Sequence, residues 1–213
     1  MQRTLVIGAS RGIGLAACEA LLAQGQQVRA LARSAQTMTL AHEALEKRQG
    51  DALVSADVSA ALDGVDAVVQ CLGVPLNLRL LTGPITLFGA ATDVLLPAMQ
   101  AAGVRRLVAV TGFGAGDSGA AIHPLQRLGF NLVFGRAYAD KSRQEALIKA
   151  SELDWTIARP GVLTNGPPRD DYRVLIEPDS WRNGVISRAS VADFIVTALA
   201  DDAYVGAAPV LVN

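Results

Sequence analysis

Three glycines that lie between an apolar strand and a helix constrain this chain more than any other feature. Residues 5–7 predict a buried strand, Gly8, Gly12 and Gly14 follow it, and residues 15–23 predict a helix. Gly8 permits a sharp turn, Gly12 leaves room for a pyrophosphate beside the backbone, and Gly14 lets the helix pack closely on the strand. The free N–H groups of the helix N-terminus attract phosphate. The pattern therefore favours a dinucleotide phosphate site over an ordinary structural turn.

The spacing G-x-x-x-G-x-G resembles that of the short-chain dehydrogenase/reductase superfamily, whose members are single-domain Rossmann enzymes that use NAD or NADP. The filling of the loop by Ala9, Ser10 and Arg11 carries the same resemblance. The resemblance implies that the cofactor contacts most of this loop, namely Gly8, Ser10, Arg11, Gly12, Ile13 and Gly14.

The end of the second predicted strand indicates which dinucleotide binds. An NAD site places an acid about 20 residues after the glycines, where it accepts hydrogen bonds from the ribose 2′-hydroxyl. Here Arg33 and Ser34 follow the strand, and no acid occurs within residues 20–42. Arg33 and Arg11 can pair with a 2′-phosphate, which an acid would repel. We therefore predict NADP(H) as the cofactor. The alternative is that both arginines are solvated surface residues.

The third strand is predicted over residues 52–56, and Asp57 follows it. In the superfamily, an aspartate here accepts a hydrogen bond from the adenine amino group, and the next residue packs on the ring. The resemblance thus implies adenine contacts from Asp57 and Val58. The alternative is a loop carboxylate that caps a short helix starting at Ser59.

Composition limits the class of protein. The chain has 213 residues, of which 51% are hydrophobic and 18% charged, with a formal net charge of −1. These values predict one well-packed globular domain without a nucleic-acid surface, a membrane span or a metal site. A first strand beginning by Thr4 leaves no room for a signal peptide. Cys18 and Cys71 are expected to be buried thiols in a reducing cytoplasm.

Strands alternate with helices along the whole chain, which predicts an α/β fold. We expect residues 1–213 to form a single Rossmann domain, with a doubly wound parallel sheet and helices on both faces. Glycines 129 and 135 could break the long helix predicted at 124–151, and Ser190 is expected to cap the last helix. Further strands are predicted at 27–32, 66–71, 105–110, 154–158, 184–187 and 209–212, and helices at 85–102, 124–151 and 190–200.

Ligands of open parallel sheets bind beyond the carboxyl ends of the strands. Three irregular stretches, 74–84, 112–123 and 162–183, leave from this edge and are expected to shape the substrate pocket. Residues that follow successive predicted strands should meet there, and we assign them to the cofactor: Cys71, Leu72, Gly73, Thr111, Gly112, Pro160, Gly161 and Val162.

The catalytic residues depart from the better-known branch of the superfamily, which places Tyr and Lys at positions i and i+4 of one helix. Lys141 has Ala137 four residues before it and Tyr138 three before it. A three-residue offset rotates Tyr138 by about 100° around the helix, so we expect it to point away from the reaction. Lys141 is predicted to bind the nicotinamide ribose, and Thr111 to take the place of the usual serine. A solvated Lys141 paired with Glu145 is the alternative.

Two further stretches resemble the atypical branch of the superfamily. Lys141 to Glu145 with residues 153–161 is similar to its lysine helix and Arg-Pro strand, and residues 186–194 are similar to its late helix. The resemblance points to NADPH-binding proteins similar to biliverdin reductase B, flavin reductases and NmrA-like regulators. In that branch a proton can come from solvent or substrate, so no catalytic tyrosine is required.

Other polar and aromatic residues have less specific interpretations. Arg159 or Arg188 is expected in a structural ion pair, with Asp193 as a further charge in apolar surroundings. His123 is a possible proton donor, although a loop histidine is more often polar surface. Core packing is the alternative for the aromatic residues that could stack on a flat acceptor, which are Phe113, Phe130, Tyr172 and Trp181.

The sequence as a whole predicts an NADPH-dependent oxidoreductase that passes hydride to a flat conjugated acceptor such as a flavin, quinone or tetrapyrrole. A non-catalytic NADP(H) sensor that binds another protein is the first alternative, and a nucleotide-sugar epimerase or dehydratase is the second. The acceptor is a small molecule whose identity the sequence leaves open. A monomer and a homodimer remain equally compatible with it, and apolar residues 76–81 are one surface that could meet a partner.

Overall fold

The computed structural model describes residues 2–74, 85–122 and 124–213. Within these ranges an eight-stranded sheet has the order β3-β2-β1-β4-β5-β6-β10-β8. All neighbours pair in parallel except β10 and β8. The strands are β1 (Arg3–Ile7), β2 (Gln27–Ala32), β3 (Leu45–Gln49), β4 (Ala67–Gln70), β5 (Arg106–Val110), β6 (Asp154–Pro160), β8 (Arg173–Leu175) and β10 (Val210–Val212).

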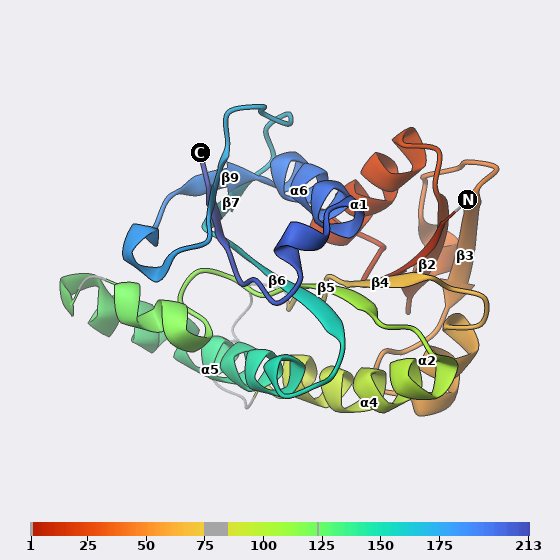
Figure 1. The fold of residues 1–213 in the computed structure, drawn as a ribbon, viewed down its shortest axis with the longest axis horizontal. Coiled ribbons are helices and arrows are strands. Elements are labelled where there is room, and N and C mark those ends of the chain that lie inside the picture. The colour runs from red at the N-terminus through yellow and green to blue at the C-terminus, as the bar shows by residue number, and fades with distance from the viewer. Residues whose placement is uncertain (1, 75–84, 123) are drawn as a thin grey trace.

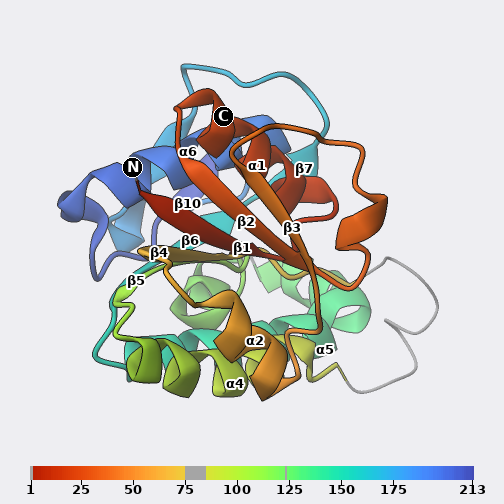
Figure 2. The same ribbon diagram turned by 90° about the vertical axis from the view of Figure 1, so that its right-hand side faces the viewer.

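Helices cover both faces of this sheet (Figures 1 and 2). One layer contains α1 (Gly12–Ala23) and α6 (Arg188–Ala200), and the other contains α2 (Ser55–Ala61), α4 (Leu87–Ala102) and α5 (Pro124–Lys149). Short elements complete the fold: η1 (Ala35–Thr37), η2 (Gly116–Ala121), η3 (Pro178–Ser180), η4 (Asp202–Tyr204) and a two-stranded sheet of β7 (Val162–Thr164) and β9 (Val185–Ser187). The predicted single-domain Rossmann architecture is confirmed.

The buried strands alternate between two hydrophobic cores because successive side chains of a strand point to opposite faces. In β1, Val6 packs in the core under α1 and α6, whereas Leu5 and Ile7 pack in the core under α2, α4 and α5. Both faces of the central strands are therefore apolar, as the run of hydrophobic residues in β1 indicates.

The predicted third strand is wrong. Residues 52–56 do not form a strand; β3 is Leu45–Gln49, and residues from Ser55 onward form α2. The sequence of β3, LEKRQ, is polar because this strand lies at the edge of the sheet and is only partly buried. Because β3 lacks an apolar run, the sequence pattern favoured a strand in the apolar segment that follows it.

Two smaller expectations also fail. Helix α5 continues through glycines 129 and 135, and α6 begins at Arg188, with Ser187 rather than Ser190 as its cap. The Ser187 side chain accepts a hydrogen bond from the Ser190 N–H at 2.9 Å. The remaining predicted elements lie within a few residues of the observed ones, and β7, β8 and η3 add short elements to the stretch expected to be irregular.

The order of the strands reverses between β1 and β4, which lie side by side at the centre of the sheet. In doubly wound sheets this point opens a crevice at the carboxyl ends of the strands, where ligands bind. No helix in the described part of the chain has the length and apolar character that a membrane span requires.

Candidate cofactor-binding site

A cavity of about 1210 Å³ lies along the carboxyl edge of the sheet. It extends from the glycine loop, past the ends of β2 and β3, to the apolar side chains of α4 and α5. The following predicted residues line it: Gly8, Ser10, Arg11, Gly12, Ile13, Arg33, Ser34, Cys71, Leu72, Gly73, Thr111, Lys141, Pro160, Gly161 and Val162.

The glycine loop has the geometry that a phosphate site needs. A Cβ on Gly8 would lie 2.6 Å from the carbonyl oxygen of Cys71, so this glycine lets β1 and β4 approach at the switch point. A Cβ on Gly14 would overlap the carbonyl oxygen of Gly8, which explains its place in the packing of α1 and not in the cavity wall. Gly12 has a φ of +61°, and the space beside it is open. These residues fit a bound pyrophosphate.

The N-terminus of α1 adds donors to this loop. Arg11 is the N-cap residue, and its side chain makes no capping hydrogen bond. The first turn of α1 contains no acidic residue. Its leading N–H groups and the positive end of its dipole thus remain available to an anion.

Arg33 lies at the end of β2, beside the glycine loop, because Ile7 of β1 pairs with Leu31 of β2. Arg33 and Arg11 are exposed and line the same cavity. Among the described residues, neither guanidinium forms an ion pair. The structure therefore places two positive charges without an ionic partner among the described residues in the wall of this cavity.

The residue at the end of β3 is Asp51, not Asp57. Asp57 lies in the first turn of α2, and its carboxylate accepts a hydrogen bond from the N–H of Asp51 at 2.8 Å. Val58 is buried in the core under α2. Neither lines the cavity, whereas Asp51, Ala52 and Leu53 do. The predicted adenine residues therefore do not line the cavity, and the misplaced third strand accounts for this difference.

Lys141 reaches the other end of the cavity from α5. Its Nζ donates a hydrogen bond to the main-chain oxygen of Thr111 at 2.5 Å. The same atom lies 5.2 Å from the ring centre of Phe88 and 5.1 Å from that of Tyr138. Burial among these groups lowers the pKa of Lys141 to about 8, while the charge of Glu145 opposes this shift. Lys141 is thus a fixed cation in the wall of the cavity.

The three-residue offset from Lys141 predicted that Tyr138 points away from the reaction, and this prediction is wrong. Tyr138 lines the cavity beside Lys141, and burial raises the pKa of its phenol. Gly112 explains how the ring fits: a Cβ there would lie 2.8 Å from the Tyr138 oxygen. Gly112 is accordingly a spacer for Tyr138 and does not itself line the cavity.

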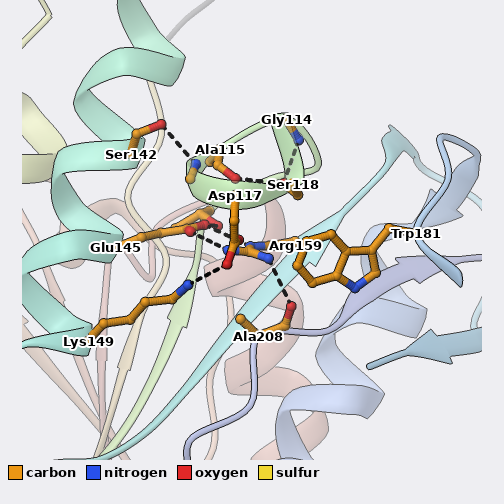
Figure 3. A network of polar contacts seen from close by, with 12 residues as sticks. Gly114, Ala115, Asp117, Ser118, Ser142, Glu145, Lys149, Arg159, Trp181 and Ala208 are labelled. Carbon is orange, nitrogen blue, oxygen red and sulfur yellow. Dashed lines mark hydrogen bonds and ion pairs between the residues drawn. The ribbon is translucent and has the colours of Figure 1, made fainter. Parts of the chain in front are cut away.

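The hydroxyl of Thr111 does not face the cavity as a serine substitute. It donates a hydrogen bond to Glu145 Oε1 at 2.7 Å. Glu145 is the buried partner of Arg159, whose Nη2 lies 2.6 Å from Glu145 Oε2 (Figure 3). The predicted structural role of Arg159 is confirmed, and the alternative pairing of Glu145 with a solvated Lys141 is not observed.

This buried pair also holds the loop after β5. Asp117 binds Arg159 and accepts a hydrogen bond from Lys149 at 3.0 Å (Figure 3). Partial burial raises the pKa of Asp117. The combined effect of Lys149 and Arg159 is larger and holds this pKa below its usual range. Trp181 covers Arg159, with 4.9 Å between the guanidinium carbon and the ring centre. These contacts attach η2 to α5 and β6.

The predicted aromatic residues have different positions. Phe113 lines the cavity, but Trp181 covers Arg159, and Tyr172 donates a hydrogen bond to Asp193 at 2.8 Å. Phe88 and Phe134, which the sequence did not single out, line the apolar end. His123, residues 75–84 and the side chain of Phe130 lie outside the described residues.

Both cysteines are buried, as predicted. Burial raises the pKa of Cys18 to about 12 and also raises the pKa of the Cys71 thiol. They are therefore uncharged thiols at neutral pH.

Arg188 is a site residue that sequence reasoning missed. It lines the cavity and forms no ion pair with any described residue, so the structural ion pair expected of Arg159 or Arg188 is made by Arg159. Its place at the end of β9 and the start of α6 was a usable signal, because the other site residues also follow strands.

Comparison with known proteins agrees with this geometry. The family model for NAD(P)H-binding proteins matches residues 8–202. The chloroplastic protein At2g34460 of Arabidopsis thaliana is 32% identical over 206 residues, which are 93% of this chain and 72% of that protein. That location gives no support to our prediction of a cytoplasmic protein.

Two solved structures share the fold. ChuY, an anaerobilin reductase from Escherichia coli O157:H7, superimposes with a TM-score of 0.80 at 23% identity, covering 99% of this chain and 97% of ChuY. A short-chain dehydrogenase/reductase from Veillonella parvula in complex with NADP gives a TM-score of 0.81 at 20% identity, covering 100% of this chain and 94% of that one. With a glycine loop at the switch point, a cavity along the carboxyl edge of the sheet and a family match over residues 8–202, the chain belongs to the NAD(P)H-binding family.

Proposed function

We propose that this protein is an NADPH-dependent reductase that transfers hydride to a flat conjugated acceptor of the flavin, quinone or tetrapyrrole type. One observation carries the proposal. A single cavity joins the phosphate-binding loop to an apolar end lined by Phe88, Phe113, Phe134 and Tyr138. Aromatic side chains favour stacked or edge contacts with a planar ligand.

The preference for NADP(H) is supported by Arg11 and Arg33, both of which line the cavity. Guanidinium groups bind phosphate through paired charge-assisted hydrogen bonds. A carboxylate that would bind the free 2′-hydroxyl of NAD is absent from the end of β2, where Arg33 and Ser34 stand.

When bound, NADPH would supply a hydride, and the acceptor would take up this hydride and one proton to give the dihydro product and NADP⁺. Lys141, in the wall of the cavity, would hold the nicotinamide ribose. Pro160 and Gly161 line the same cavity and would contact the nicotinamide. Their backbone is held by hydrogen bonds, because Phe113 N–H donates to the Pro160 oxygen at 2.9 Å and Gly161 N–H donates to the Leu211 oxygen at 3.0 Å. The apolar side chains exclude water from the hydride path.

The proton has its source in solvent or in the acceptor. Thr111 does not supply it, because its hydroxyl donates to Glu145. Tyr138 stays protonated at neutral pH because its pKa is raised, and it lines the same part of the cavity. Tyr138 is not required as the proton donor in the proposed reaction, and the Tyr138→Phe variant tests this.

The test measures NADPH oxidation by its absorbance with flavins, quinones and linear tetrapyrroles as acceptors. Tetrapyrroles belong in the panel because ChuY, which shares the fold, reduces one. We expect turnover with at least one class and loss of turnover in Gly12→Val. Tight NADPH binding without oxidation by any acceptor class would contradict the proposal.

An NADP(H)-sensing regulator is the second candidate. One observation favours it: the Thr111 hydroxyl and the Lys141 ammonium are both engaged by protein groups, so neither is poised on a substrate. A sensor should bind oxidised and reduced cofactor with similar affinity and show no turnover, which titration of both forms distinguishes from a reductase.

A further inference from the structure

Arg188 brings the last helix to the glycine loop. Its Nε lies 3.9 Å from the point that a Cβ on Gly12 would occupy, and outside the chain neighbours and the adjoining backbone of α1 no other described heavy atom lies within 4 Å of that point. Helices α1 and α6 lie side by side in both ribbon views (Figures 1 and 2). The open space over Gly12 is therefore bounded by the glycine loop on one side and by the Arg188 guanidinium on the other.

The Arg188 side chain is held in this position from behind. Its Nη1 donates to the main-chain oxygen of Thr164 at 3.0 Å and to Asn165 Oδ1 at 2.6 Å. Both partners are neutral, so they orient the guanidinium without cancelling its charge. A guanidinium has five N–H donors, and these two bonds use one nitrogen.

The neighbouring helix terminus has a different role. The N-terminus of α6 is capped internally, because Ser187 Oγ accepts from the Ser190 N–H. The N-terminus of α1 has no side-chain cap. The N-terminus of α1 is therefore the helix end available to an anion. Helix α6 supplies a positive charge through the Arg188 side chain, which lies between the two helices.

We propose that Arg188 binds the pyrophosphate of the dinucleotide from the side opposite the glycine loop. The inference rests on the proposed function only in requiring that an NAD(P)-type dinucleotide enters this cavity. Arg33 lies at the end of β2 and faces the adenosine ribose, so the two arginines divide the phosphates of NADP between them. Arg188 raises affinity for any dinucleotide, whereas Arg33 selects the 2′-phosphate.

The anchor of Arg188 gives this contact a second consequence. Asn165 follows β7 in the stretch expected to shape the substrate pocket. A bound pyrophosphate would contact Arg188, and Arg188 is hydrogen-bonded to Asn165 in that stretch. Asn165 is accordingly a positioning residue for Arg188 and makes no contact with the cofactor.

The experiment measures the dissociation constants of NADPH, NADH and adenosine 2′-monophosphate by titration for the intact chain and four variants. Arg188→Ala should weaken NADPH and NADH by the same factor, at least about tenfold, and leave adenosine 2′-monophosphate unchanged. Arg188→Lys should retain part of the affinity, because lysine keeps the positive charge but lacks the paired N–H donors of the guanidinium. Asn165→Ala should cause a smaller loss than Arg188→Ala.

The control is Arg105→Ala. Arg105 is an exposed arginine, paired with Asp154 directly before β5 at the opposite edge of the sheet. The Arg105→Ala variant should bind all three ligands with the affinity of the parent chain. Thermal unfolding without ligand checks that each variant is folded.

Unchanged NADPH affinity in folded Arg188→Ala would overturn the inference, and so would a loss confined to NADPH, because that would place Arg188 on the 2′-phosphate. Failure of the proposed function has a different signature. In that case the parent chain binds dinucleotide with the expected Arg188 dependence but oxidises no NADPH.

Discussion

Glu145 and Arg159 form an ion pair of 2.6 Å in which both side chains are almost completely removed from solvent. The other Glu145 oxygen, Oε1, accepts a hydrogen bond from the Thr111 hydroxyl. The main-chain oxygen of Thr111 in turn accepts a hydrogen bond from Lys141 Nζ. The pair therefore fixes the strand end that holds the one lysine of the cavity wall. It links the stability of the interior to the geometry of the site.

Removing one partner of this pair should be costly. We expect Glu145→Ala to lower the free energy of unfolding by about 3 kcal/mol, because it leaves a buried guanidinium with only Asp117 as its acidic partner. Denaturant unfolding measures the loss. In a double-mutant cycle with Arg159→Met, the second substitution should cost much less in the Glu145→Ala background than alone. Additive losses would show that the pair does not act as a unit.

NADPH affinity should fall as the pH rises through about 8. The pKa of Lys141 lies near that value, so the ammonium that we propose as the ribose contact loses its proton there. Titrations from neutral to alkaline pH should show this inflection in the parent chain and not in Lys141→Gln. An identical pH profile in both would exclude a role for the charge of Lys141.

The same pKa has the opposite effect on stability. The folded-state pKa of Lys141 is depressed from 10.5 to about 8, so between these values the unfolded chain binds more protons than the folded one. The contribution of Lys141 to the free energy of unfolding should therefore rise with pH across this window. The difference in stability between the parent and Lys141→Gln, followed by urea unfolding, should change in that direction. A difference independent of pH would contradict the depressed pKa.

Arg33→Asp should remove the preference for NADP(H). We expect the parent chain to favour NADPH over NADH by at least about tenfold, or ~1.4 kcal/mol, because solvent exposure reduces the full value of a charge-assisted pair. The substituted aspartate repels the 2′-phosphate and accepts from a free 2′-hydroxyl. Calorimetric titration of both cofactors measures the ratio. Tighter binding of NADH by the parent chain would show that the arginines are ordinary surface residues.

Gly12→Val should abolish dinucleotide binding and leave the sheet folded. A valine there would stand in the open space beside the loop, and its φ of +61° is strained for any residue with a Cβ. Circular dichroism should stay close to that of the parent, while titration with NADPH should show no saturable binding. Unchanged affinity would mean that the loop is a structural turn only.

Tyr138→Phe should lower the reductase rate by less than about tenfold if solvent or the acceptor supplies the proton. Loss of a true general acid costs about 10²–10⁴ in rate. Lys141→Ala should be more damaging, mainly through the Michaelis constant for NADPH. Steady-state rates of the two variants with the same acceptor give the comparison.

A hundredfold loss in Tyr138→Phe with normal NADPH affinity would assign the proton to this phenol. That outcome is compatible with the position of Tyr138 beside Lys141 in the cavity wall. It would move the reaction toward that of a carbonyl reductase.

The sequence by itself determined the fold class and the phosphate-binding end of the site. Gly8, Gly12 and Gly14 follow an apolar strand directly, so local backbone sterics specify their roles without knowledge of distant residues. Arg33 was predicted for a similar reason, since the end of a buried strand is easily recognised. In a parallel sheet, recognising the strands is enough to bring their carboxyl ends to one edge.

Only the tertiary structure decided what depends on contacts between distant elements. The polar edge strand β3 is stabilised by pairing with β2 and has no apolar run of its own, which is why the sequence pattern placed the third strand at residues 52–56. The direction of Tyr138 depends on the space left by Gly112, 26 residues earlier in the chain, and the Thr111 hydroxyl turns to a carboxylate on α5. Arg188 reaches Gly12 only because α6 packs beside α1. Side-chain direction at a site is set by packing between elements, and local sequence does not encode it.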